Sequence, residues 1–107
     1  MTSSQLPNYL VSNRKRLSLS QAEVAFLMGN TDGTQISRYE HFDREPSLEA
    51  ALALEVIFQR SASELFNGLY QRIEAEVIER AKTLSKQSKL TSEKRQVFIN
   101  IASKSLN

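Results

Sequence analysis

Apolar side chains recur at three- and four-residue spacing along almost the whole chain, which is the pattern of amphipathic helices. The leucines of residues 6–17 show this spacing, and Pro7 suits the first turn of a helix. Glycine and proline together supply only five residues, and they fall between the periodic runs. The pattern therefore predicts an all-α protein whose first helix begins near Pro7.

Residues typical of helix ends divide the next part of the chain. Ser20 is a suitable N-cap, and Glu23 completes a capping box three residues later. Gly29 is placed to end this second helix. Asp32 is then expected to cap a third helix. The apolar side chains that this third helix is expected to turn inward are Ile36, Tyr39 and Phe42.

Two further helices are predicted before residue 68. The run that Ser47 opens is apolar on nearly all sides, so we expect it to form the most buried helix. Ser61 and Glu64 make a second capping box ahead of a short fifth helix. Asn67 and Gly68 are expected to close that helix. The five predicted helices form one compact domain over residues 1–68.

Residues 69–107 differ in character and predict a helical extension. A long amphipathic helix is indicated first, followed by a polar break over residues 85–90 and by a last helix that Thr91 caps. The apolar stripe of the long helix consists of Leu69, Ile73, Val77, Ala81 and Leu84. The sequence leaves open whether this stripe packs against the chain's own domain or against a second subunit. The extension is the candidate dimerisation region.

Charge is distributed unevenly between the two parts. Residues 1–66 contain 6 Lys and Arg against 8 Asp and Glu, a net charge of −2, whereas residues 67–107 contain 8 against 4, a net charge of +4. Nucleic-acid-binding domains usually show a basic footprint. In this chain such a footprint has to be local in the first part, with help from the extension.

Composition argues against several classes of function. The chain has no cysteine and one histidine, His41, so we expect no metal site. We also expect no enzyme and no cofactor, since the closest group of carboxylates, Glu74, Glu76 and Glu79, lies on a charged helix face without a partner that would shift a pKa. The chain lacks a long apolar run and a secretory signal at its start, which predicts a cytoplasmic protein without a membrane partner.

The stretch from residue 21 to residue 40 resembles the helix-turn-helix of the Cro and phage-repressor (XRE) family. The resemblance rests on Gln21 at the start of a helix, Ala25 four residues later, Gly29 at the turn, and the sequence ISRYE at residues 36–40. Residues 45–66 also resemble the stretch that follows in the family. The ordered set of features extends from residue 6 to residue 66.

The resemblance implies a fold and a division of the chain. Residues 1–68 would be a five-helix, repressor-like DNA-binding domain, with helix 2 at about residues 21–28 and the recognition helix at about residues 33–41. Residues 69–107 would be the C-terminal helical extension. The turn is one residue longer than is usual in the family, which is expected to place Gly33 in the first turn of the recognition helix.

The resemblance also implies site residues. Those expected to contact bases are Thr34, Gln35, Ser37 and Arg38. Among them Arg38 is the leading candidate, because arginine can bind guanine O6 and N7 bidentately. Those expected to contact phosphates are Arg14, Ser20, Gln21 and Arg44. Arg14 falls where the family has an arginine that pairs with a glutamate at the end of the recognition helix, here Glu40.

The leading hypothesis is a sequence-specific transcriptional regulator of double-stranded DNA, expected to act as a repressor. A single small domain reads only about four to six base pairs, so a homodimer on a palindromic site is expected. The extension is too short for an ordinary ligand-sensing domain, so no small-molecule effector is expected. The alternative is a protein-interaction module, antitoxin-like, in which the fold is kept and DNA binding is weak.

Overall fold

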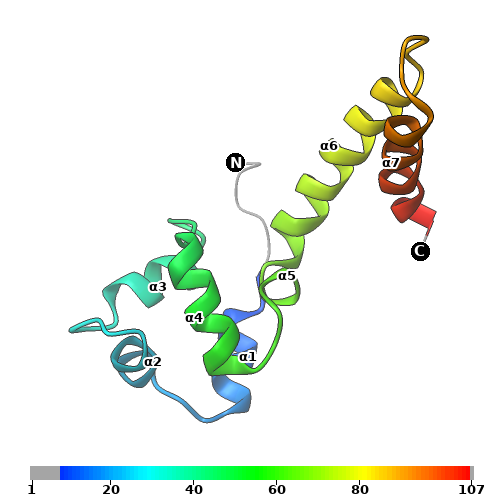
Figure 1. Ribbon diagram of the computed structural model, residues 1–107. Helices are drawn as coiled ribbons and strands as arrows, with labels where there is room; N and C mark the ends of the chain where they lie inside the picture. The colour runs from blue at the N-terminus through cyan, green and yellow to red at the C-terminus, as the bar shows by residue number, and fades with distance from the viewer. Residues whose placement is uncertain (1–7, 107) are drawn as a thin grey trace. The chain divides into compact units, whose positions relative to one another are not determined.

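The computed structural model describes residues 8–106, and every regular element in that range is a helix, which confirms the all-α prediction. The chain divides into two compact units, Met1–Tyr70 and Gln71–Asn107, called unit 1 and unit 2 below (Figure 1). The first helix, α1 (Leu10–Arg16), begins later than predicted, because Asn8 and Tyr9 are not helical. Pro7 itself lies outside the described residues.

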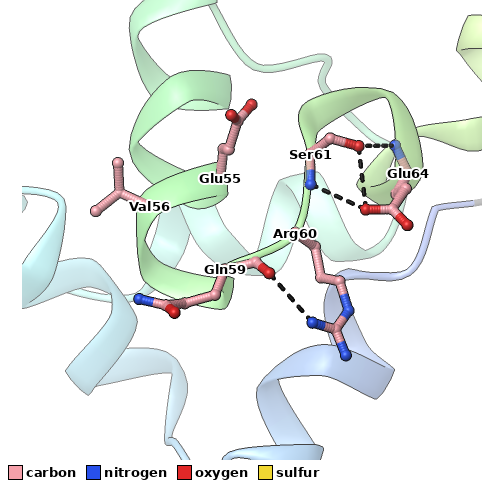
Figure 2. Close-up of a pocket in the computed structure, with 6 residues that line it drawn as sticks. All are labelled: Glu55, Val56, Gln59, Arg60, Ser61 and Glu64. Carbon is pink, nitrogen blue, oxygen red and sulfur yellow. Dashed lines mark hydrogen bonds between the residues drawn. The ribbon is translucent and has the colours of Figure 1, made fainter.

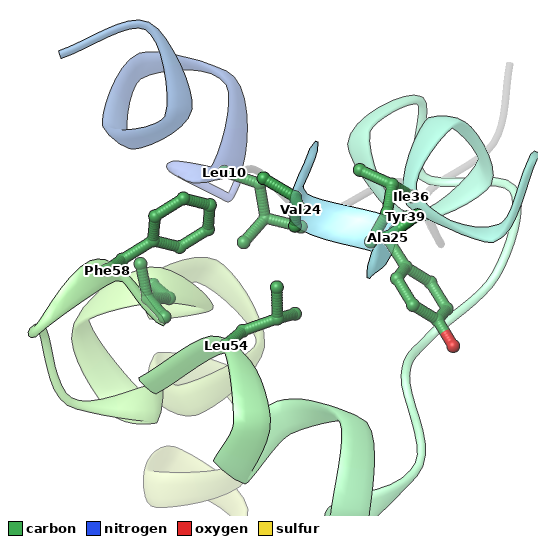
Figure 3. Close-up of a cluster of buried hydrophobic side chains, with 8 residues drawn as sticks. Leu10, Val24, Ala25, Ile36, Tyr39, Leu54 and Phe58 are labelled. Atoms are coloured by element: carbon green, nitrogen blue, oxygen red, sulfur yellow. The ribbon is translucent and has the colours of Figure 1, made fainter. Parts of the chain in front are cut away.

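Short helices build unit 1 around one apolar cluster. After α1 come α2 (Gln21–Leu27), α3 (Thr34–Glu40), α4 (Leu48–Phe58) and α5 (Ala62–Leu65). The cluster takes side chains from all five, and Figure 3 shows them converging between the helices. Its buried members are Leu10, Val24, Ala25, Ile36, Tyr39, Leu54, Phe58 and Leu65.

Both predicted capping boxes are present. The hydroxyl of Ser20 accepts a hydrogen bond from the backbone N–H of Glu23, whose carboxylate accepts one from the backbone N–H of Ser20. Ser61 and Glu64 make the same reciprocal pair at the start of α5, beside a hollow at the end of α4 (Figure 2). Each pair satisfies two N–H groups that a helix start leaves without partners.

Three helices of unit 1 end in the same hydrogen-bonded turn. Gly29 has φ of +85° after α2, Ser18 has φ of +60° after α1, and Phe42 has φ of +65° after α3. At each site two backbone N–H groups return to carbonyls of the last helical turn, as in a Schellman motif. The expectation that Phe42 turns inward was wrong: its side chain is exposed, and the left-handed backbone carries the chain away from the core.

Helix α4 is not the most buried helix, contrary to the prediction. Leu54 and Phe58 are buried, but the side chains of Leu48 and Val56 are 76% and 72% exposed. The other helices of unit 1 cover only one face of α4, whereas its sequence is apolar on several faces. Leu48, Leu52 and Val56 form an exposed apolar stripe on the uncovered face.

The predicted break at Asn67 and Gly68 was also wrong. Helix α5 ends at Leu65, and α6 (Asn67–Ser85) begins two residues later, so both residues lie in the first turn of α6. Phe66 alone separates the two helices, with φ of −115° and ψ of 50°. Glycine keeps its backbone N–H and can therefore join a helix, at a cost of about 0.5–1 kcal/mol relative to alanine.

Unit 2 consists of the rest of α6, α7 (Ser92–Ala102) and a short 3-10 helix, η1 (Ser103–Leu106). Thr91 caps α7 as predicted, since its hydroxyl accepts the N–H of Lys94. The guanidinium of Arg95 donates to the carbonyls of Ser85 and Gln87 at 2.6 and 2.9 Å, which ties α7 to the end of α6.

Replacing Gly29 by alanine is expected to lower the free energy of unfolding by about 1–2 kcal/mol, since L side chains disfavour positive φ. The loss is purely conformational, because a Cβ at Gly29 would meet no atom within 4 Å. Urea denaturation measures it. The control is Gly29→Asn, because asparagine tolerates this conformation and is expected to lose less. Equal losses in the two variants would contradict this account.

Candidate nucleic-acid interface

Helices α2 and α3 are locked by small and apolar side chains at their crossing. Ala25 of α2 is buried, as are Ile36 and Tyr39 of α3. The left-handed Gly29 turns the chain between them, and the N–H of Asn30 closes the turn on the carbonyl of Ala25 at 2.8 Å. The small side chain of Ala25 allows α3 to pass close above α2, so the outer face of α3 is held in one orientation.

A buried polar cluster fixes the far end of α3. Glu40 is 5% exposed, and its carboxylate accepts Nε of Arg14 at 2.6 Å and Nη2 of Arg14 at 3.2 Å. The side-chain amide of Gln21 donates to the same carboxylate at 2.8 Å. Arg14 also donates to the carbonyl of Leu19 at 3.1 Å. The hydrogen bond to Glu40 raises the pKa of Arg14 above its usual value. The pairing that the family resemblance implied is therefore present.

Three of the predicted base-reading residues share one face of α3. Thr34, Ser37 and Arg38 are spaced three and four residues apart, so they lie on one side of the helix. Thr34 and Arg38 are exposed, and Ser37 is half-buried. The guanidinium of Arg38 makes no hydrogen bond or ion pair within residues 8–106. It therefore stands free to contact a ligand.

His41 joins this face, which the sequence reasoning missed. Its Nδ1 lies 2.7 Å from the carbonyl oxygen of Ser37 and 3.3 Å from the hydroxyl oxygen of Ser37. A carbonyl only accepts, so Nδ1 carries the proton and Nε2 is left toward solvent. The signal in the sequence was the spacing, since His41 follows Ser37 by four residues and Arg38 by three.

Gln35 does not lie with the other predicted base readers. Its Oε1 is buried, and its side chain lines a hollow with residues of α2 and α4, among them Leu27 and Ala50. The Oε1 atom of Gln35 is thus enclosed by neighbouring helices, unlike the side chains of Thr34 and Arg38, and base contact by Gln35 stays a prediction.

Of the four residues predicted to contact phosphates, Arg44 has an exposed side chain, and the other three have side chains that bond within the protein. Arg44 is exposed in the loop between α3 and α4, whereas the Arg14 guanidinium is held by Glu40. The Ser20 hydroxyl serves as the cap of α2, and the side-chain nitrogen of Gln21 is bound to Glu40. The backbone N–H groups of Gln21 and Ala22 donate no hydrogen bond within the described range, as expected at a helix start.

Asp32 and Gly33 shape the entry into α3. The carboxylate of Asp32 accepts the N–H of Thr34 at 2.9 Å, which lowers the pKa of Asp32 and keeps it charged. Gly33 directly precedes α3 and does not lie in its first turn, contrary to expectation. Its φ is −86°, but a Cβ there would lie 3.2 Å from Cβ of Gln21. Glycine is thus favoured at position 33 by the close approach of α2.

Comparison with known families agrees with this geometry. A family model described as helix-turn-helix matches residues 12–65, which is half of the chain. The chain belongs to the helix-turn-helix family of the Cro and phage-repressor (XRE) type. This helix-turn-helix protein is accordingly a DNA-binding transcription regulator. No curated protein and no solved structure matches the chain significantly.

Two features are absent from residues 8–106, namely a membrane-spanning helix and a cluster of metal-binding side chains. No helix of the helix-turn-helix protein in residues 8–106 is both long and apolar enough to cross a membrane. In the same range no three side chains of His, Cys, Asp or Glu gather where they could hold a metal ion.

Replacing Glu40 by glutamine is expected to lower the free energy of unfolding by about 2 kcal/mol, because the half-buried Arg14 loses its counter-charge. Glu40→Ala is expected to lose more, since Gln21 then also loses its acceptor. Chemical denaturation measures both, with the exposed Glu45→Gln as the matched control. Losses no larger than that of Glu45→Gln would show that the cluster is not stabilising.

Proposed function

We propose that α3 is the recognition helix and reads base edges in the major groove of double-stranded DNA. The observation that carries the proposal is the free guanidinium of Arg38, on an exposed helix face whose orientation the Arg14–Glu40 pair supports. The major groove, about 12 Å wide, admits one helix. Thr34 and Ser37 are the neighbouring base contacts, and Arg38 takes a guanine.

Phosphate contacts would then set the register of α3 on the duplex. Arg44 lies in the loop that follows α3 and supplies an exposed cation. The unpaired N–H groups of Gln21 and Ala22 at the start of α2 are suitable donors to a phosphate oxygen. We assign Ser20 and Arg14 supporting roles there, since the Ser20 hydroxyl and the Arg14 guanidinium already have partners within the protein.

The regulator acts, in this proposal, as a homodimer on a palindromic site, with half-sites about one helical turn apart. One domain reads too few base pairs to select a site in a genome. Residues 69–107 supply the dimer interface, and occupation of the site represses transcription. No small-molecule effector enters the scheme, and the cytoplasm is its proposed location.

Selection of bound duplexes from a random DNA pool tests this function. The wild type is expected to enrich a palindrome, and Arg38→Ala to relax it at one or two base pairs in each half-site. The lost contact corresponds to about 1–3 kcal/mol of discrimination between bases. Arg60→Ala is the matched control, because it removes a cation from the α4–α5 loop, at the far end of α4 from Arg44.

Two results would contradict the proposal. One is the absence of any enriched motif, and the other is a motif that Arg38→Ala leaves unchanged while Arg60→Ala alters it. Measuring the wild type at two salt concentrations separates phosphate contacts from base contacts, because only the former give a steep dependence of affinity on salt.

Replacing Asp32 by asparagine is expected to tighten DNA binding several-fold at low salt. The substitution removes a negative charge beside the start of α3, while the asparagine oxygen can still accept the N–H of Thr34. Fluorescence anisotropy with the selected duplex measures the change. The gain is expected to shrink as salt rises, since salt screens the repulsion. A gain that is independent of salt would show that charge is not its cause.

A second candidate function is protein interaction with weak DNA binding. The exposed apolar stripe of α4, formed by Leu48, Leu52 and Val56, favours it, because large apolar patches often mark interaction surfaces. The net charge of −2 over residues 1–66 also favours it. Strong, salt-dependent binding of the wild type to DNA would exclude it as the main function.

A further inference from the structure

Unit 2 leaves an apolar stripe of α6 uncovered. The side chains of Ile73 and Val77 are 44% and 43% exposed, and Leu84 is exposed as well. The buried residues of α6 are Ile78 and Ala81, which do not belong to the core cluster of unit 1. Helix α7 lies next to the C-terminal end of α6, where Arg95 donates to the carbonyls of Ser85 and Gln87. At about 100° per residue, the exposed stripe lies roughly a quarter turn around the helix from the buried Ile78 and Ala81.

The stripe has the spacing of a helix-pairing seam. Positions 73, 77, 80 and 84 follow one another at intervals of four, three and four residues, which is the a/d spacing of a coiled coil. Arg80 occupies the one polar position. Its alkyl stem can lie along apolar neighbours while its guanidinium reaches outward. Arg80 makes no ion pair within the described part of the chain.

Charge along α6 is split between its two ends. Residues 67–76 of α6 contain Arg72, Glu74 and Glu76, a net charge of −1. Residues 77–85 contain Glu79, Arg80 and Lys82, a net charge of +1. Two α6 helices that pair in parallel would bring like halves together. An antiparallel pair would set the acidic half of each against the basic half of the other.

We propose that the occupant of this stripe is α6 of a second copy of the chain, antiparallel and related by a two-fold axis near residues 78 and 79. Ile73 of each copy then faces Leu84 of the other, and Val77 packs beside the stem of Arg80. The guanidinium of Arg80 lies within reach of Glu76 of the other copy. The pairing is isologous, as a two-fold interface requires. The functional role of this pairing rests on the proposed function, in which a homodimer binds a palindromic DNA site.

Sedimentation of the full chain without DNA tests the pairing. The wild type is expected to be a dimer, and Val77→Glu to raise its dissociation constant about 100-fold or more, because each interface would bury two carboxylates. The matched control is Ala75→Glu, which adds the same charge at an exposed position of α6 outside the stripe. It is expected to remain dimeric. Circular dichroism must show equal helix content in both variants.

Disulfide cross-linking tests the antiparallel orientation. Because the chain has no native cysteine, every disulfide that forms must join the introduced cysteines. Copies with Ile73→Cys and copies with Leu84→Cys, distinguished by mass, are mixed and oxidised. The disulfide between positions 73 and 84 is expected to predominate. Disulfides joining 73 to 73 and 84 to 84 instead would overturn the antiparallel pairing, because the cysteines must approach to within about 7 Å between Cα atoms.

Failure of the pairing and failure of the proposed function give different results. A monomeric wild type, or a dimer that Val77→Glu leaves intact, overturns the pairing, whatever the DNA selection yields. A dimer that cross-links from 73 to 84 but enriches no DNA motif keeps the pairing and overturns DNA reading by Arg38.

Discussion

The carboxylate of Glu40 is the interaction on which the helix-turn-helix geometry depends. Three hydrogen bonds reach it from Arg14 of α1 and Gln21 of α2, so one buried group of α3 joins three helices. Apolar packing alone is non-directional. The hydrogen bonds from the Arg14 guanidinium and the Gln21 amide require particular angles, so they add a directional constraint to the apolar packing. They thereby set the rotation of α3 about its own axis.

That constraint matters because α1, α2 and α3 each have only seven residues. Isolated helices of this length are not stable in water. They persist here because their C-terminal ends close in hydrogen-bonded turns and their apolar faces meet in one cluster. The orientation of the exposed face of α3 is therefore a property of the whole of unit 1, and Arg38 keeps its position only as long as the packing of Ile36 and Tyr39 holds.

The two units use apolar residues differently. In unit 1 they form one cluster, to which five helices contribute side chains. In unit 2, α6 and α7 can cover only one face of each other. A two-helix unit has a high ratio of surface to volume and leaves apolar area exposed. The split charge of α6 gives that exposed stripe a direction, which an apolar surface by itself lacks.

Local signals in the sequence determined the starts of α2 and α5 and the turn after α2. Ser20 with Glu23, Ser61 with Glu64, and Gly29 act within a few residues, so their roles could be predicted without knowing the fold. The family resemblance likewise predicted the Arg14–Glu40 pair and the exposed Arg38.

Only the tertiary structure decided which faces are buried. The stripe of α4 is apolar in sequence yet exposed, because none of the described helices of unit 1 lies on that side. The side chain of Gln35 turns inward because residues of α2 and α4 enclose it. His41 joined the α3 face through a bond to Ser37 that forms at the helix end. Burial depends on what other segments bring to a residue, and the periodicity of a single helix does not contain that information.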